Sequence, residues 1–198
     1  GEDDTAIVQL ESLLKDKNAQ SYFEFALVYL GEMYQRRGTT ESRRKAKQHF
    51  ERALATYPSS AMSNRCRLGL AQIFQADGQL ENADRFLQFL VDAEDPTIQE
   101  EAIVSRASIL VELQRPAEAK ALLSPETLQQ LPAELQAKAI YWLGKAELVE
   151  GEWEAAAADL RRAVGALRDD NLAEAAVYDC AIALWRMGDQ EGADELLQ

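Results

Sequence analysis

The feature that most constrains this chain is an internal repeat with a period of 36 or 37 residues. One series of small residues keeps this spacing: Ala46, Ala83, Ala119, Ala156 and Ala193. A second series of small residues precedes it by twelve positions or slightly more: Gly31, Ala71, Ala107, Gly144 and Ala181. A helix-breaking segment separates the two series in each copy: Gly38, Gly78, Arg115-Pro116, Gly151 and Gly188. Three series with nearly the same period predict a protein built from repeated units.

Each unit is predicted to be two α-helices joined by a tight turn. Apolar residues recur at helical spacing before the breakers, as in Val177, Ala181 and Leu184. The first helices are expected at residues 23–37, 61–76, 99–114, 132–150 and 173–187. The second helices are expected at residues 43–56, 80–93, 117–123, 153–167 and from residue 190 onward. No segment shows the period-two alternation of a β-strand.

The small residues have a packing role in this arrangement. Two helices joined by a short turn must cross closely, and only Gly or Ala at the crossing lets their backbones approach. Larger residues follow the second-helix alanines by four positions and would fill the flanks: Phe50, Leu87, Leu123, Leu160 and Leu197. One such helix pair cannot bury its apolar face alone, so we expect each pair to stack on its neighbours.

This arrangement resembles the tetratricopeptide repeat family. The first full copy carries the residues that resemble the family pattern: Leu27, Leu30, Gly31, Tyr34, Gly38, Ala46, Phe50, Ala53 and Pro58. It differs at Leu27, where Trp is usual, and its turn has three extra residues. The fourth copy has Glu147 where an aromatic residue is usual, and the third lacks the turn glycine. The resemblance covers roughly residues 22–198.

The predicted fold is all-α, an α-α superhelical solenoid of about five helix-turn-helix repeats. We expect a single solenoid over residues 1–198. Its predicted parts are a partial repeat at 1–18, full repeats at 22–58, 61–96, 99–125 and 132–168, and a truncated repeat at 172–198. Because the chain begins and ends within a repeat, we expect it to be a piece of a longer protein.

Charge and hydropathy exclude several classes of partner. The net charge is −13, whereas nucleic-acid binding needs clustered Lys and Arg, so we expect no nucleic-acid partner. One basic cluster departs from this trend: Arg36, Arg37, Arg43, Arg44, Lys45, Lys47 and Arg52. We interpret it as solvated surface, with an anion site as the alternative. No apolar run is long enough to span a membrane, and no signal peptide is present, so cytoplasm and periplasm both stay open.

Residues suited to catalysis or metal binding are scarce. His49 is the only histidine, which excludes histidine-based triads and two-histidine metal sites. Phosphate-binding glycine loops and nucleophile motifs are absent from the sequence. The cysteines Cys66 and Cys180 fit no metal-binding or redox spacing. We therefore predict no catalytic residue, no metal and no cofactor, and we expect that the chain is not an enzyme.

The resemblance to tetratricopeptide repeats implies where a partner binds. In that family the first helices line a concave groove, in which extended peptides or helices lie. The candidate groove residues are Lys138, Tyr141, Lys145, Tyr178, Ile182, Trp185, Arg186, Arg65 and Gln72. We expect these side chains to face solvent, and aromatic residues flanked by cations suit a partner with an apolar anchor and an acidic group. The alternative is that Tyr178 and Trp185 pack between neighbouring helices.

The predicted function is a non-catalytic scaffold for protein–protein interaction, which binds a peptide or a helix of a partner in the groove. The two-repeat carboxylate clamp that some family members use is not implied, because Val28 and Glu32 occupy its Lys and Asn positions. Two alternatives stay open. The chain could self-associate as a homo-oligomer through uncapped ends, or it could localise a longer bacterial-type envelope, secretion or regulatory protein.

Overall fold

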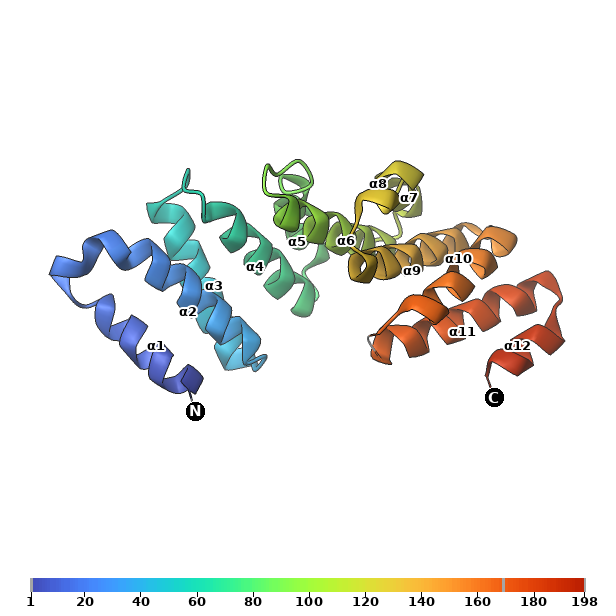
Figure 1. The fold of residues 1–198 in the computed structure, drawn as a ribbon, viewed down its shortest axis with the longest axis horizontal. Coiled ribbons are helices and arrows are strands. Elements are labelled where there is room, and N and C mark those ends of the chain that lie inside the picture. Colours follow the sequence, from blue (N-terminus) through green and yellow to red (C-terminus); the bar gives the residue numbers. More distant parts are fainter. Residues whose placement is uncertain (1, 169, 198) are drawn as a thin grey trace. The chain divides into compact units, whose positions relative to one another are not determined.

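The structure of the chain, a computed structural model, describes residues 2–168 and 170–197 (Figure 1). Regular structure in these residues is helical, with no strand, as the sequence predicts. Gly1 and Gln198, the outer limits of the predicted solenoid, lie outside the described residues. The chain divides into two compact units, residues 1–99 and 100–198, which we call the first and the second unit.

The first unit consists of adjacent, packed helices. Its elements are α1 (Glu2–Leu13), the 3-10 helix η1 (Lys17–Tyr22), α2 (Phe23–Arg36), α3 (Thr40–Thr56), α4 (Ser63–Ala76) and α5 (Leu80–Gln88). Each α-helix packs against the next one along the chain, and α2 also packs against α4. The helix α5 ends earlier than residue 93, the predicted end. After Gln88 the backbone forms hydrogen bonds of the i→i+3 type instead. The Leu90 amide donates to the Leu87 carbonyl, and the Ala93 amide donates to the Leu90 carbonyl.

The second unit repeats this arrangement. Its elements are α6 (Pro96–Glu112, which starts just before residue 100), α7 (Pro116–Leu122), α8 (Pro125–Gln130), α9 (Ala133–Glu150), α10 (Trp153–Ala166), α11 (Asp170–Met187) and α12 (Gln190–Leu196). The helices from α9 to α12 pack consecutively, and α9 also packs against α7, α8 and α11. The sequence did not predict α8. Its start is nevertheless encoded, because the Ser124 hydroxyl accepts a bond from the Thr127 amide and Pro125 suits the first helical turn.

Small residues lie at the helix crossings. The Phe50 ring is fully buried between Gly31 of α2 and Gly69 of α4, and a Cβ atom at either glycine would overlap it. In the second unit a Cβ atom at Gly144 would lie 2.8 Å from Leu160 Cγ. The crossing role predicted for Gly31 and Gly144 is therefore confirmed. Gly69 lies outside the predicted series and shows that Phe50 of one repeat reaches the first helix of the next.

The third copy turns without glycine. Gly38, Gly78, Gly151 and Gly188 all have positive φ at the end of a first helix, and Gln114 adopts φ 59° at the equivalent turn. A left-handed conformation brings a Cβ atom too close to the backbone, so it costs roughly 1 kcal/mol for residues other than glycine. The turn of the third copy therefore forms at the expense of local backbone strain.

Glu147 is a buried acid at a position where the family usually has an aromatic residue. Its carboxyl lies in the packing of α9, and Oε2 has no hydrogen-bond partner among the described residues. Burial raises the pKa of Glu147 to about 7, and the negative charge of Asp159 adds to this shift. Lys120 acts in the opposite direction, but its ammonium group is already bonded to Glu150 and Glu152, at 2.8 and 2.6 Å.

A matched pair of substitutions on α10 tests the crossings. Ala156 is fully buried, whereas Ala158 on the same helix is exposed. We expect Ala156→Leu to overpack the crossing and lower the free energy of unfolding by about 1–3 kcal/mol, while Ala158→Leu has little effect. Denaturant unfolding followed by circular dichroism measures both. Equal losses for the two variants would show that Ala156 does not lie at a crossing.

A reciprocal exchange tests the strain at Gln114. Gln114→Gly should raise the free energy of unfolding by about 0.5–1 kcal/mol, because glycine adopts the left-handed conformation without strain. Gly78→Gln should lower it by a similar amount, and a Cβ atom at Gly78 would meet no atom within 4 Å, so a clash would not contribute. Thermal melts of both variants provide the comparison. If Gln114→Gly melts at a lower temperature than the wild type, the backbone at Gln114 is not strained.

The pH dependence of stability tests Glu147. Because folding raises its pKa from 4.5 to about 7, the folded state loses stability as pH rises through this window. Glu147→Gln removes the ionisation, so its advantage over the wild type should grow between pH 5 and pH 8, up to about 3 kcal/mol. Melting temperatures across this range measure the difference, with Glu154→Gln on the surface as the control. If the difference in melting temperature between the wild type and Glu147→Gln does not change with pH, folding does not raise the pKa of Glu147.

Candidate functional site

The nine predicted groove residues fall into two groups. Arg65 and Gln72 lie on α4 of the first unit. The other seven lie on α9 and α11 of the second unit. Their side chains differ widely in exposure, and most of the polar ones are engaged in contacts within the chain.

In the first unit the predicted groove residues connect α2 and α4. Arg65 Nη2 lies 2.6 Å from Glu32 Oε1, and its guanidinium lies 5.3 Å from the centre of the Tyr29 ring. Gln72 Oε1 accepts a hydrogen bond of 2.5 Å from Gln35 Nε2. Both pairs join a first helix to the next first helix. Arg65 and Gln72 therefore hold neighbouring repeats together, and their polar groups are already partnered.

In the second unit Asp179 of α11 ties together two predicted groove residues of α9. The Tyr141 hydroxyl donates to Asp179 Oδ2 at 3.0 Å, and Lys145 Nζ lies 2.5 Å from Oδ1. Burial raises the pKa of the Tyr141 hydroxyl, and the nearby carboxylate adds to this shift. Tyr141 is only 4% exposed. The expectation that Tyr141 faces solvent is therefore wrong, because α11 packs over this part of α9.

Asp179 was missed by the sequence prediction, although a signal for it exists. It follows Lys145 by 34 positions and Tyr141 by 38. Glu32 and Arg65 are 33 positions apart, and Arg43 and Asp77 are 34 apart. Complementary polar residues separated by about one repeat therefore mark contacts between neighbouring helix pairs.

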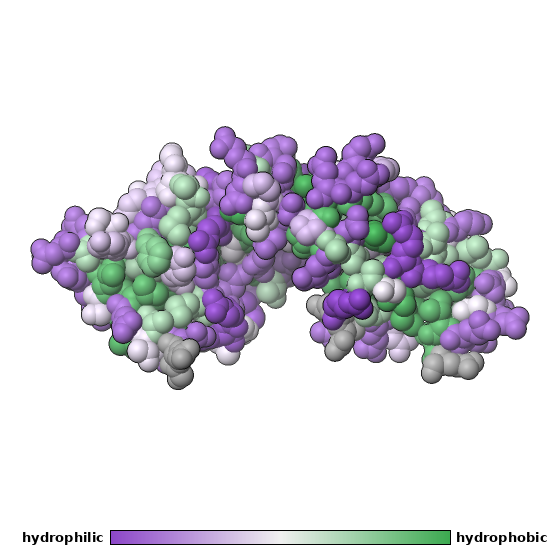
Figure 2. Space-filling view, in the orientation of Figure 1, coloured by the Kyte–Doolittle hydropathy of each residue, from purple (hydrophilic) through white to green (hydrophobic). Residues whose placement is uncertain are grey.

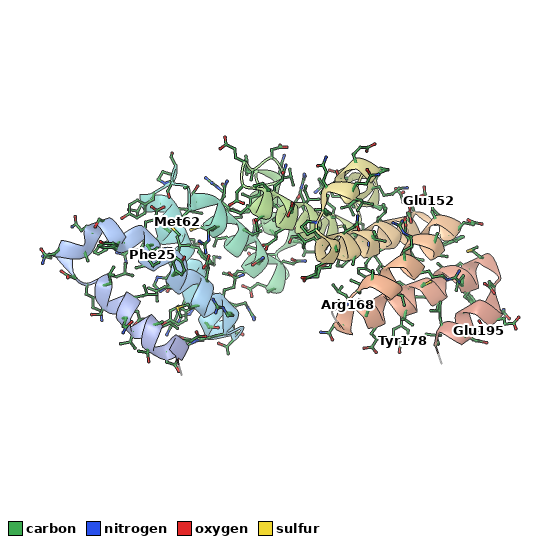
Figure 3. The ribbon with its side chains drawn as sticks, in the orientation of Figure 1. Phe25, Met62, Glu152, Arg168, Tyr178 and Glu195 are labelled. Carbon is green, nitrogen blue, oxygen red and sulfur yellow. The ribbon has the colours of Figure 1, made fainter. Side chains whose placement is uncertain are left out.

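The outer face of α11 is apolar and exposed. Tyr178, Ile182 and Trp185 are 56%, 47% and 56% exposed and lie one helical turn apart, so they form one continuous strip, which we call the α11 stripe. Tyr178 projects outward from α11 in Figure 3. Figure 2 shows apolar surface over the C-terminal helices, bordered by hydrophilic residues. The exposure predicted for these three side chains agrees with the structure.

The cations predicted to flank the aromatic residues are in different states. Lys145 is paired with Asp179, and Lys138 Nζ lies 2.9 Å from Glu134 on its own helix. Arg186 lies over two aromatic rings, 5.4 Å from the centre of Trp185 and 5.7 Å from that of Trp153. Each of the two lysines is thus paired with a carboxylate. The described contacts of Arg186 are with aromatic rings and include no carboxylate.

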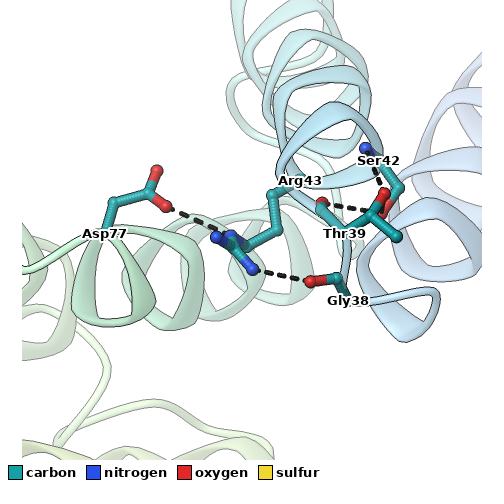
Figure 4. A network of polar contacts seen from close by, with 5 residues as sticks. All are labelled: Gly38, Thr39, Ser42, Arg43 and Asp77. Atoms are coloured by element: carbon teal, nitrogen blue, oxygen red, sulfur yellow. Dashed lines mark hydrogen bonds and ion pairs between the residues drawn. The ribbon is translucent and has the colours of Figure 1, made fainter.

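The basic cluster of the first unit is largely neutralised by nearby acids. Arg43 lies 3.1 Å from Asp77 of the next helix pair and also donates to the Gly38 carbonyl (Figure 4). Three further pairs of the cluster are Arg37 with Asp4, Arg44 with Glu41, and Lys47 with Glu51. This pairing favours the interpretation of solvated surface over that of an anion site.

The described residues contain no other cluster of side chains suited to catalysis or metal binding. His49 stacks on the Tyr34 ring at 5.7 Å, and burial lowers the pKa of its imidazole. In residues 2–168 and 170–197 no cluster of His, Cys, Asp and Glu could hold a metal ion. None of the described helices combines the length and hydropathy needed to cross a bilayer.

Comparison with known proteins finds one repeat match and one likeness of fold. A family model described as "Tetratricopeptide repeat" matches residues 25–60, which include most of α2 and all of α3. Among solved structures the chain is similar to the crystal structure of BtubC (BKLC) from P. vanneervenii, with a TM-score of 0.73 and 16% identity over 98% of this chain and 85% of that chain. At this identity the likeness shows the fold alone. No curated protein matches the chain.

These matches agree with the helix pairs described above. Tetratricopeptide repeats generally mediate protein–protein interaction, and proteins of this fold are typically non-catalytic scaffolds. The chain thus contains a tetratricopeptide repeat at residues 25–60, and its fold is an α-α solenoid of helix pairs.

Proposed function

We propose that this chain is a non-catalytic scaffold that binds a peptide or a helix of a partner protein, and that the α11 stripe is its anchor point in the predicted groove. The observation that carries this proposal is the exposure of Tyr178, Ile182 and Trp185 on one face of one helix. Apolar residues are usually scattered singly on a protein surface, and a contiguous exposed group marks an interaction site.

The chemistry of the stripe suits protein recognition. Tyr and Trp dominate the binding energy of protein interfaces, because each offers a large, rigid apolar surface with one polar group. Arg186 borders Trp185 and can meet an acidic group on the partner. The lysines contribute less than the sequence predicted, since Lys138 and Lys145 are paired within the chain. The selectivity of this surface therefore depends mainly on shape and aromatic contact.

A matched pair of surface variants tests the proposal. In the first variant the stripe becomes polar by Tyr178→Ser, Ile182→Ser and Trp185→Ser. In the control, Val8→Ser and Phe89→Ser replace apolar residues of the first unit that are more exposed than the stripe. We expect the stripe variant to weaken the binding of native partners by at least about tenfold, since an interface anchor is typically worth about 2 kcal/mol. Both variants should keep the wild-type melting temperature.

Affinity capture after chemical cross-linking in cells that express the chain, followed by quantitative mass spectrometry, measures this loss. Partners that depend on the stripe but not on Val8 and Phe89 support the proposal. If the stripe variant retains all partners of the wild type, the binding surface lies elsewhere. Tyr141 and Lys145 are unsuitable for this test, because their loss would leave Asp179 buried without a partner.

A further inference from the structure

The fourth helix pair differs from the others at two equivalent positions. One position lies on the first helix, three places after its small residue, and the other lies three places after the small residue of the second helix. In the fourth copy both are acids, Glu147 and Asp159. In the other copies both positions carry rings or aliphatic side chains: Tyr34 with His49, Phe74 with Phe86, Leu110 with Leu122, and Leu184 with Leu196.

Contacts in the first two copies show where these two positions point. Tyr34 stacks on His49 with ring centres 5.7 Å apart, and Phe74 stacks on Phe86 at 5.6 Å. The preceding second helix reaches the same place, because the Lys47 ammonium of α3 lies 4.5 Å from the centre of the Phe74 ring. Side chains at this pair of positions therefore lie between a first helix, its own second helix and the second helix before it.

The fourth copy has a polar centre at the same place. Lys120 of α7 occupies the repeat position of Lys47, and the charges of Asp159 and Lys120 both act on Glu147. Glu147 is only 7% exposed, and its Oε2 has no hydrogen-bond partner among the described residues. The Lys120 ammonium is already bonded to two other carboxylates. This copy therefore contains a buried acceptor without a donor.

A cavity of about 370 Å³, the volume of a small ligand site, lies beside this carboxyl group. Glu147 follows Leu143 of the cavity wall by one helical turn and so lies on the same face of α9. The lining belongs to residues 120–162 of the second unit, with further helices before and after them, so the ends of the chain do not leave the cavity open. The lining includes Lys120, Leu123, Leu128, Leu143, Asp159 and Arg162.

Acids outnumber cations around this cavity. Asp159 is bonded to Arg162, whose side chain is 62% exposed. Lys120 is bonded to two carboxylates, one at the end of α9 and one just before α10, and Glu147 adds a further carboxyl group. The complement of the cavity is therefore a cation that donates hydrogen bonds. Because no cluster of the described residues could hold a metal ion, this cation is organic.

We propose that this cavity together with Glu147, which we call the acidic pocket, binds the guanidinium group of an arginine side chain of a partner protein. The group donates to Glu147 and Asp159, and its alkyl stem lies against Leu123, Leu128 and Leu143. The proposal goes beyond the proposed function, because the acidic pocket and the α11 stripe share no residue and neither depends on the other.

A guanidinium group fits this place better than other donors. It is planar, as are the rings at the equivalent place in the first two copies, and it is less strongly hydrated than an ammonium group. Its five N–H donors can serve both carboxyl groups at once. Asp159 keeps acceptor sites beside its bond to Arg162, since a carboxylate accepts about four hydrogen bonds. The net charge of −13 also favours a basic partner.

Three capped tripeptides test this inference on the full chain. The first is acetyl-Gly-Arg-Gly-amide, and the other two carry lysine or citrulline in the middle; citrulline keeps the shape of arginine without its charge. Titrations at pH 8, above the Glu147 pKa of about 7, are followed by the leucine methyl signals in NMR spectra. We expect the arginine peptide to shift the signals of Leu123, Leu128 and Leu143 until they saturate. The lysine peptide should bind more weakly and the citrulline peptide not at all.

Substitutions locate the contact. Glu147→Gln and Asp159→Asn should each weaken binding of the arginine peptide by about tenfold, because each removes a charge-assisted hydrogen bond. Glu154→Gln, the same kind of change on the exposed surface of α10, should leave the affinity unchanged. Glu147→Phe combined with Asp159→Phe copies the ring pair of the second repeat, so it should fill the pocket and abolish binding. Thermal melts show whether each variant is folded.

The other outcomes would overturn the proposal or separate it from the proposed function. Equal binding of the arginine peptide and either other peptide would exclude a guanidinium site, as would equal binding by wild type and Glu147→Gln. If free arginine shifts the three leucines but the capped peptide does not, the pocket takes a small molecule and a partner protein is excluded. Photo-crosslinking in cells from Gln129, which lines the pocket, to the same polypeptide would likewise exclude a partner. If the arginine peptide binds but the polar stripe variant keeps all its partners, the acidic pocket stands and the α11 stripe fails.

Discussion

Burial of each helix pair by the next is the constraint on which this structure depends. The Phe50 side chain belongs to α3, yet it fills the space between Gly31 of α2 and Gly69 of α4. Its burial thus requires two helix pairs, and the same holds for Tyr141, which α9 supplies and α11 covers. A repeat of this kind is stable only in a stack, because its largest side chains are shielded partly by a neighbour.

Polar contacts between neighbouring pairs are a second consequence of stacking. Glu32 with Arg65 and Lys145 with Asp179 link consecutive first helices. Partly exposed ion pairs such as Glu32 with Arg65 contribute at most about 1 kcal/mol each, so their main effect here lies elsewhere. They occupy charges that a partner could otherwise use. Under the proposed function, recognition would therefore depend on side chains without such contacts, and Tyr178 and Trp185 of α11 are the proposed examples in the second unit.

Features that depend on local chemistry could be predicted from the sequence. The period of the small residues and the turn glycines locates the helix pairs, because crossings and left-handed turns require these residue types. Gln114 shows the limit of this reasoning, since packing holds a residue other than glycine in a strained turn. Likewise, Tyr141 and Tyr178 are the same residue at the same repeat position. Their different exposure depends on which helix follows, which a periodic pattern does not encode.

The magnitude of the exposed surface limits how a partner can bind. Covering the exposed part of Tyr178, Ile182 and Trp185 would contribute roughly 1 kcal/mol per side chain. Association itself costs at least about 4 kcal/mol in lost translational and rotational freedom, so the stripe alone would support only weak binding. Under the proposed function, a partner would therefore have to contact residues beyond these three side chains.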